Sequence, residues 1–234
     1  MHSIKYFYDG LDIEKYGANP QIVGFTTNCS LFSTNNIKNY RDFYKKCQPL
    51  LNNRCISFQI WEDGLLGLQQ IDEIAELAAN APEIYVKIPI IDSTGFFNID
   101  LIEHAKQKKM KINITAIYSM EQIYQTYNIL QNYEEHCIVS IFAGPISDCG
   151  VDPSHLVLTI VELFNNNPNV EVLWAGCREL YAIIRAQEMK CDIITIPGDM
   201  LDKLNLFESN PAELSLLRVN KFKNDAIKGK ITIK

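Results

Sequence analysis

The chain has 234 residues, of which 47% are hydrophobic and 21% are charged, and this length and composition predict one globular domain rather than two. Its formal net charge of -6 argues against a nucleic acid or an anionic membrane surface as the main partner. The sequence has no bilayer-spanning apolar stretch and no signal-peptide core near its first residues, and its 7 cysteines form no Cys-x-x-Cys pair. We therefore expect a cytoplasmic protein with reduced thiols.

Apolar strand patterns alternate with amphipathic helical patterns along the chain. Short apolar runs predict strands at residues 5–8, 21–25, 54–60, 84–88, 111–115, 137–142, 170–174 and 192–196. Apolar residues at helical spacing predict helices at residues 39–51, 66–80, 98–108, 120–131, 154–165 and 180–189, and a shorter helix after Pro197. No linker or composition break divides the series.

Strands with interposed helices in this order predict an α/β fold, a closed (β/α)8 TIM barrel that forms a single domain over residues 1–234. An open doubly wound sheet is the alternative. A further helix is predicted at residues 211–228, with Leu214, Leu217 and Phe222 at helical spacing. Because this helix follows the eighth unit, it lies outside the barrel, and its apolar stripe must cap an end or reach a neighbouring subunit. We therefore expect a homo-oligomer.

Lys87 is the most informative residue of the chain. It lies in the apolar run Val86-Lys87-Ile88-Pro89, which predicts a buried strand. Burial of an ammonium group costs on the order of several kcal/mol, so such a lysine either pairs with a carboxylate or becomes a neutral amine. A neutral amine at a strand end can form a Schiff base with a carbonyl substrate. A lysine that extends to solvent or pairs with an acid is the equal alternative from this strand alone.

Other polar residues lie at the predicted carboxyl ends of the strands, where catalytic residues gather in barrels of this kind. Asp9 is the one carboxylate among them and suits a general base beside Lys87. The others are neutral hydrogen-bonding residues: Thr26, Asn28, Gln59, Asn113, Thr115 and Ser140. Each has an ordinary alternative, because Asp and Asn cap turns and Thr favours strands. Their positions at successive strand ends favour a shared site.

Several segments carry a resemblance to a known family: residues 8–12, 24–30, 86–89, 112–115, 140–144 and 186–201. In this order the chain resembles the transaldolase family, in the short branch that includes fructose-6-phosphate aldolases. Thr26-Thr27-Asn28 together with Val86-Lys87-Ile88-Pro89 is the specific part of the resemblance.

The resemblance implies a Schiff-base mechanism that needs no cofactor. Lys87 would form an imine with a ketose, and Asp9 would deprotonate the hydroxyl next to the breaking bond. Thr115 and Gln59 would hold the catalytic water. The enamine of a dihydroxyacetone unit then attacks an acceptor aldehyde in a transaldolase, or is released in an aldolase.

Departures from the family pattern bear on the reaction and on the substrate. Gln59 stands where transaldolases place a glutamate, as in the aldolase branch, whereas Phe142 is the transaldolase-like choice where that branch has a tyrosine. Pro145 replaces an arginine that contacts the substrate phosphate, and Gly176 replaces a serine. Arg178 is retained. Loss of one charge-assisted contact removes about 1.5 to 3 kcal/mol of binding free energy.

We therefore expect a transaldolase-type transferase that acts on an atypical sugar or sugar phosphate. The alternatives are an ordinary pentose-phosphate-pathway transaldolase, a fructose-6-phosphate-aldolase-like lyase, and a catalytically idle barrel that binds a sugar or a partner. The four histidines lack metal-ligand spacing, so we expect no metal site. The expected substrate-binding residues are Thr26, Asn28, Asn113, Ser140, Phe142, Gly176 and Arg178.

Overall fold

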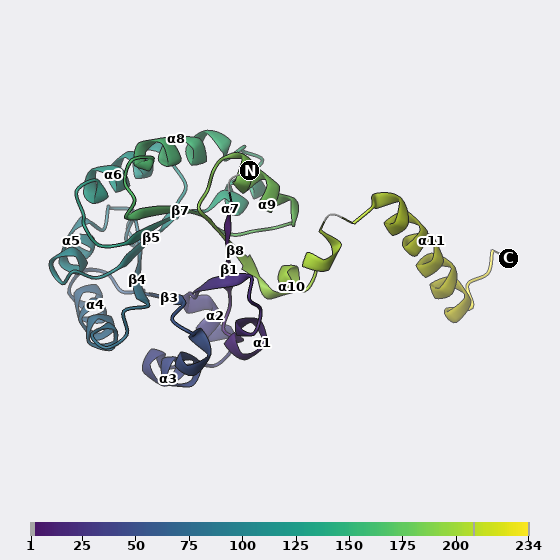
Figure 1. The fold of residues 1–234 in the computed structure, drawn as a ribbon, viewed down its shortest axis with the longest axis horizontal. Coiled ribbons are helices and arrows are strands. Elements are labelled where there is room, and N and C mark those ends of the chain that lie inside the picture. Colours follow the sequence, from purple (N-terminus) through teal and green to yellow (C-terminus); the bar gives the residue numbers. More distant parts are fainter. Residues whose placement is uncertain (1–2, 208, 234) are drawn as a thin grey trace. The chain divides into compact units, whose positions relative to one another are not determined.

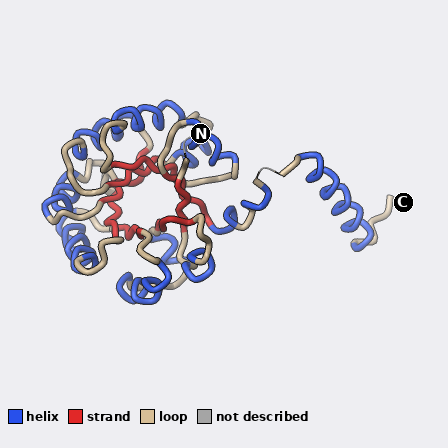
Figure 2. The backbone as a smooth tube through the Cα atoms, viewed as in Figure 1, coloured by secondary structure: helices blue, strands red, loops and turns tan. Residues whose placement is uncertain are grey.

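A computed structural model describes residues 3–207 and 209–233. Its strands form a closed barrel in which each strand is parallel to its neighbours, and β1 pairs with β8 to complete the ring (Figures 1 and 2). The predicted (β/α)8 barrel is confirmed, and the open sheet is excluded. The strands are β1 Lys5–Asp9, β2 Ile22–Thr26, β3 Cys55–Gln59, β4 Ile84–Pro89, β5 Ile112–Ile117, β6 Cys137–Ile141, β7 Val170–Trp174 and β8 Ile193–Pro197.

Helices surround this barrel (Figure 2). They are α1 Ile13–Gly17, α2 Cys29–Thr34, α3 Tyr40–Leu51, α4 Gly64–Ala78, α5 Ile99–Gln107, α6 Met120–Leu130, α7 Ala143–Asp148, α8 Ser154–Phe164, α9 Tyr181–Glu188 and α10 Gly198–Leu201. The longer helices match their predicted positions. The sequence pattern missed α1, α2 and α7, because helices of five or six residues are too short to show an apolar stripe.

The chain divides into two compact units, Met1–Leu201 and Asp202–Lys234. The first holds the barrel. The second holds a 3-10 turn, η1 Leu204–Leu206, and the helix α11 Pro211–Lys228, which begins with a proline and is capped by the Asn210 side chain. The helix predicted at residues 211–228 is therefore confirmed. Within the described residues, no helix combines the length and apolarity needed to cross a bilayer.

The barrel interior has an apolar layer beneath a polar one. The apolar layer is formed by buried side chains from β1, β4, β6, β7 and β8 and from the residue just after β7: Phe7, Tyr85, Ile138, Leu173, Ala175 and Ile193. Because side chains alternate along a strand, residues two positions farther on share the same face. Those residues include Asp9, Lys87, Ser140 and Thr195. The strand register places Lys87 beside Gln59 on one side and Asn113 on the other. The predicted site residues thus come together at the carboxyl end of the barrel.

Candidate active site

Lys87 lies on β4 with only 6% of its surface exposed. Its Nζ donates a hydrogen bond of 3.2 Å to the backbone carbonyl of Thr27. Burial lowers the pKa of the amine, and the negative charges of Asp9 and Cys29 act weakly in the opposite direction. Among the described residues no salt bridge holds this lysine in its charged form. Burial therefore shifts this lysine toward the neutral amine, which is the nucleophilic form.

Asp9 ends β1 and belongs to a hydrogen-bonded chain that includes two threonines. Thr26 Oγ1 donates to Asp9 Oδ1 at 2.8 Å and lies 2.5 Å from Thr195 Oγ1. Both threonines are buried, whereas Asp9 is half-buried. The contact fixes one carboxylate oxygen of Asp9 and leaves the other free to take a proton. Thr26 therefore orients the acid, and substrate binding is not required to explain its position.

Thr115 is 1% exposed, and its Oγ1 has no hydrogen-bond partner among the described residues. An unpaired buried hydroxyl costs about 1 to 3 kcal/mol, and a bound water is a common partner for such a group. Gln59 lies at the end of β3, and its backbone carbonyl accepts a 2.7 Å hydrogen bond from the Tyr40 hydroxyl. The strand register places Gln59 next to Lys87.

Asn113 is fully buried, and both ends of its side-chain amide are used inside the barrel. Its Nδ2 donates to Ser57 Oγ at 3.1 Å, and its Oδ1 accepts from Ser140 Oγ at 2.8 Å. The resulting network ties β3, β5 and β6 together directly beside Lys87. Asn113 and Ser140 therefore form a hydrogen-bonded network next to the lysine. These hydrogen bonds occupy polar groups that were expected to bind substrate.

Asn28 and Phe142 each begin a short helix at the mouth of the barrel. The Asn28 side chain accepts from the Leu31 amide at 2.9 Å and caps α2, which leaves its Nδ2 group for a ligand. Phe142 precedes α7, and its ring lies 5.3 Å from that of Tyr118, measured between centroids. Phe142 and Tyr118 thus form a pair of neighbouring aromatic rings.

Arg178 and Gly176 lie in the loop after β7. Arg178 Nε donates to Asp148 Oδ2 at 2.8 Å, so the guanidinium is already paired. Gly176 has a φ of +70°, and a Cβ at this position would meet Pro145 Cδ at 2.5 Å. The proline ring fills the space that a serine at position 176 would occupy.

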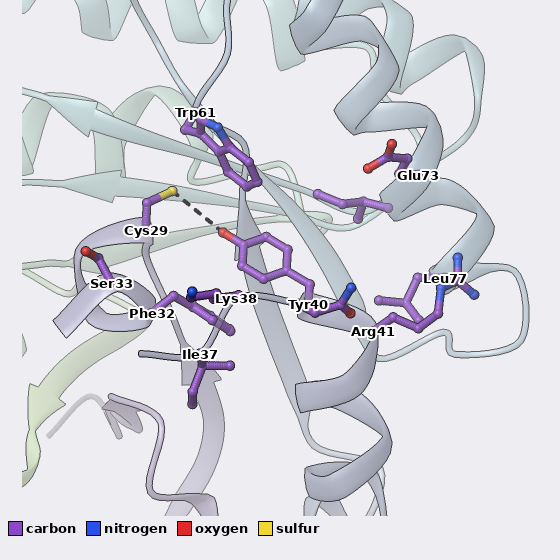
Figure 3. Close-up of a pocket in the computed structure, with 12 residues that line it drawn as sticks. Cys29, Phe32, Ser33, Ile37, Lys38, Tyr40, Arg41, Trp61, Glu73 and Leu77 are labelled. Atoms are coloured by element: carbon purple, nitrogen blue, oxygen red, sulfur yellow. Dashed lines mark hydrogen bonds between the residues drawn. The ribbon is translucent and has the colours of Figure 1, made fainter. Parts of the chain in front are cut away.

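A separate pocket of about 700 Å³ lies between α2, α3 and α4. Figure 3 shows Tyr40 pointing between Cys29 and Trp61, with Glu73 on the opposite wall. Lys87, Asp9 and Thr115 are not among its lining residues. Its connection to the site runs through Cys29, whose Sγ lies 3.6 Å from the Tyr40 hydroxyl and 3.7 Å from the Gln59 carbonyl.

The sequence analysis missed three residues that shape the site. Thr195 faces inward two positions after Ile193, so strand alternation was the signal that could have identified it. Tyr40 and Tyr118 come from a helix and a loop, and their contacts depend on tertiary packing that no local pattern predicts. Within the described residues, no group of three or more His, Cys, Asp and Glu side chains is arranged to hold a metal ion.

Comparisons with known proteins show which family this chain resembles in sequence. Residues 6–232 match the family described as Transaldolase/Fructose-6-phosphate aldolase. A relative named "Probable transaldolase" from Methanococcus maripaludis is 29% identical over 86% of this chain and 89% of the relative. Another of that name, from Phocaeicola vulgatus, is 29% identical over 83% of this chain and 87% of its own.

The solved structures give the fold. The crystal structure of 3-hexulose-6-phosphate synthase from Salmonella typhimurium matches with a TM-score of 0.57 at 10% identity, covering 83% of this chain and 89% of that one. At such low identity, the match bears on the barrel and not on the substrate.

Proposed function

Because the chain belongs to the transaldolase/fructose-6-phosphate aldolase family, we propose that it uses Lys87 as a Schiff-base nucleophile to move a dihydroxyacetone unit between sugars. The observation that carries the proposal is the burial of Lys87 on β4, where the charge of Asp9 acts on it and no salt bridge is formed among the described residues. Together these features supply a neutral amine and a base within one barrel mouth.

The first steps form the imine. The Lys87 amine attacks the ketose carbonyl carbon, and the carbonyl oxygen leaves as water after two proton transfers. Thr115 Oγ1, which has no partner among the described residues, and the Gln59 amide hold and orient this water. Because Gln59 is a neutral amide, it can orient water but cannot take its proton.

The next step breaks the carbon-carbon bond. Asp9 takes the proton from the hydroxyl on the carbon next to the breaking bond, and that carbon leaves as an aldehyde. The bonding electron pair moves into the protonated imine and gives an enamine. Thr26 holds one Asp9 oxygen during this step. The enamine then attacks an acceptor aldehyde, and hydrolysis of the new imine restores Lys87.

We favour transfer on an atypical sugar. Phe142 puts an aromatic ring without a hydroxyl where the aldolase branch has a tyrosine, which disfavours protonation of the enamine by this residue. Pro145 and Gly176 remove two side chains that contact phosphate in the resembling family. Simple aldol cleavage is the second candidate, and the neutral side chain of Gln59 favours it.

Borohydride trapping tests the proposal. Reduction in the presence of a ketose panel should add the mass of a three-carbon unit to the peptide that contains Lys87. The Lys87→Met variant should show neither the adduct nor turnover. Labelling of another lysine, or undiminished turnover of this variant, would falsify the assignment.

A further inference from the structure

The mouth of the barrel is poor in positive charge. In the loops that connect each of the strands to its following helix, Arg178 is the only Lys, Arg or His. The same loops carry five acidic residues: Asp12, Glu62, Asp63, Asp92 and Glu179. Phosphate groups are bound by cationic side chains or by free backbone N–H groups. The loops supply one cation for such a ligand.

That cation is already paired. Arg178 Nε donates to Asp148 Oδ2 at 2.8 Å, while the two side chains remain 55% and 52% exposed. Asp148 lies on α7, which follows β6, and Arg178 lies in the loop after β7. The pair therefore connects the segments that follow two neighbouring strands. A carboxylate held against a guanidinium reduces the positive charge that a phosphate would meet.

The starts of α7 and α10 offer no replacement. At the start of α7, the Gly144 amide donates to the Ala175 carbonyl at 3.2 Å, and Pro145 has no amide hydrogen. The helix α10 carries Asp199 in its first turn, where the negative charge opposes an anion.

The same residues suit an uncharged polyol. The exposed carboxylate of Asp148 can accept hydrogen bonds from sugar hydroxyls, and the N–H groups of Arg178 that do not contact this carboxylate can donate to them. Tyr118 adds a third polar group. Burial raises the pKa of its phenol, and the positive charge of Arg178 acts in the opposite direction.

We propose that the distal end of the ketose is an unphosphorylated polyol, and that Asp148 and Arg178 bind its hydroxyl groups as one unit. The inference rests on the proposed function, because it assigns the substrate class of the same site. Asp148 is then the residue that excludes a terminal phosphate, by repelling it and by holding Arg178.

The test compares specificity constants for fructose and fructose 6-phosphate with the full chain. We expect wild-type protein to handle fructose at least as well as fructose 6-phosphate. Asp148→Asn removes the repelling charge and frees Arg178, so the preference should shift toward fructose 6-phosphate by about tenfold or more. Asp148→Glu should keep most of the wild-type preference. The matched control is Asp152→Asn, which breaks a second Asp–Arg pair, to Arg185, and should leave the preference unchanged.

Borohydride trapping of each ketose on Lys87 separates the two possible failures. If Lys87 is labelled but wild-type protein prefers fructose 6-phosphate by about tenfold or more, the polyol inference is overturned and the proposed function stands. The polyol inference is likewise overturned, and the proposed function stands, if Asp148→Asn leaves the ratio of the specificity constants for fructose and fructose 6-phosphate unchanged. If neither ketose labels Lys87, the proposed function fails, and the inference fails with it.

Discussion

Pro145 and Gly176 lie so close together that a side chain at position 176 has no room. A Cβ on Gly176 would meet Pro145 Cδ at 2.5 Å and Pro145 Cγ at 3.1 Å. The φ of Gly176 is +70°, in the left-handed region that favours glycine. The two departures from the family pattern therefore form one packing unit, in which the proline requires the glycine.

The first prediction follows from this contact. Gly176→Ala should destabilise the fold by about 1 to 3 kcal/mol through overpacking, in addition to about 1 to 2 kcal/mol for the left-handed backbone. The double variant with Pro145→Ala should recover the overpacking part. Urea unfolding of the single and double variants measures both contributions.

Gly150→Ala is the matched control for backbone strain. Its φ is +76°, and a Cβ there would have no atom within 4 Å. It should therefore show the strain alone. Equal losses in the Gly150 and Gly176 variants would show that Pro145 does not crowd position 176.

The sequence predicted the parts of the site that follow from strand alternation. Asp9, Lys87 and Thr115 lie at strand ends on the inward face, and the period of two along a strand suffices to place them there. It did not predict how side chains pair across the barrel. Asn113 contacts Ser57 and Ser140, and these contacts depend on the register of three strands.

Ion pairs were equally hidden in the sequence. Arg178 was expected to bind substrate phosphate, and nothing in the local pattern indicated that Asp148, thirty positions earlier, forms an ion pair with it. A loop conformation decides this contact, and loops follow no periodic rule. Family resemblance therefore predicts roles for residues such as Arg178, whereas their partners depend on the tertiary structure.

The second prediction concerns the stability of the protein with Lys87 replaced. Burial lowers the pKa of Lys87 below its ordinary value of 10.5, so at neutral pH the unfolded chain binds a proton that the folded chain disfavours. Lys87→Met removes this penalty and should therefore raise the free energy of unfolding at neutral pH. Urea unfolding at neutral pH measures the gain.

The gain from Lys87→Met should shrink as the pH rises. Wild-type stability increases with pH between the folded pKa and 10.5, because the unfolded lysine loses its proton in that range. Above 10.5 this contribution is gone. Lys45→Met, at a lysine side chain that is 68% exposed, should change stability by less than about 0.5 kcal/mol at any of these pH values. A pH-independent gain from Lys87→Met would contradict the assignment.

The third prediction separates imine formation from bond cleavage. Asp9→Asn keeps an oxygen that can accept from Thr26 Oγ1 but removes the base. The variant should still be trapped on Lys87 by borohydride, whereas turnover should fall by roughly a hundredfold or more. If the folded variant no longer binds ketose, Asp9 is a binding group and the proposed role is wrong.

The fourth prediction concerns the water held by Thr115. Thr115→Val removes a hydroxyl that has no partner among the described residues, so stability should not fall, while turnover should drop by about tenfold or more. Thr126→Val is the reverse case. Thr126 lies on α6, away from the strand ends, and its Oγ1 donates a 2.8 Å hydrogen bond to the Gln122 carbonyl. This control should lose about 1 kcal/mol of stability and keep its activity. Unchanged turnover in Thr115→Val would remove Thr115 from the mechanism.

The last prediction concerns the helix α11, which is 18 residues long. Leu216, Leu217, Val219 and Phe222 on this helix are each more than half exposed. Several exposed apolar side chains on one helix are typical of an interface, so we expect α11 to pack against another copy of the chain. Leu217→Glu with Phe222→Glu, or truncation before Pro211, should lower the mass measured by light scattering. Asn220→Glu with Asn224→Glu adds the same charge to the same helix without removing an apolar side chain, and should leave the mass unchanged. A monomeric wild-type protein, or a mass that the Leu217 and Phe222 substitutions do not alter, would rule out this interface.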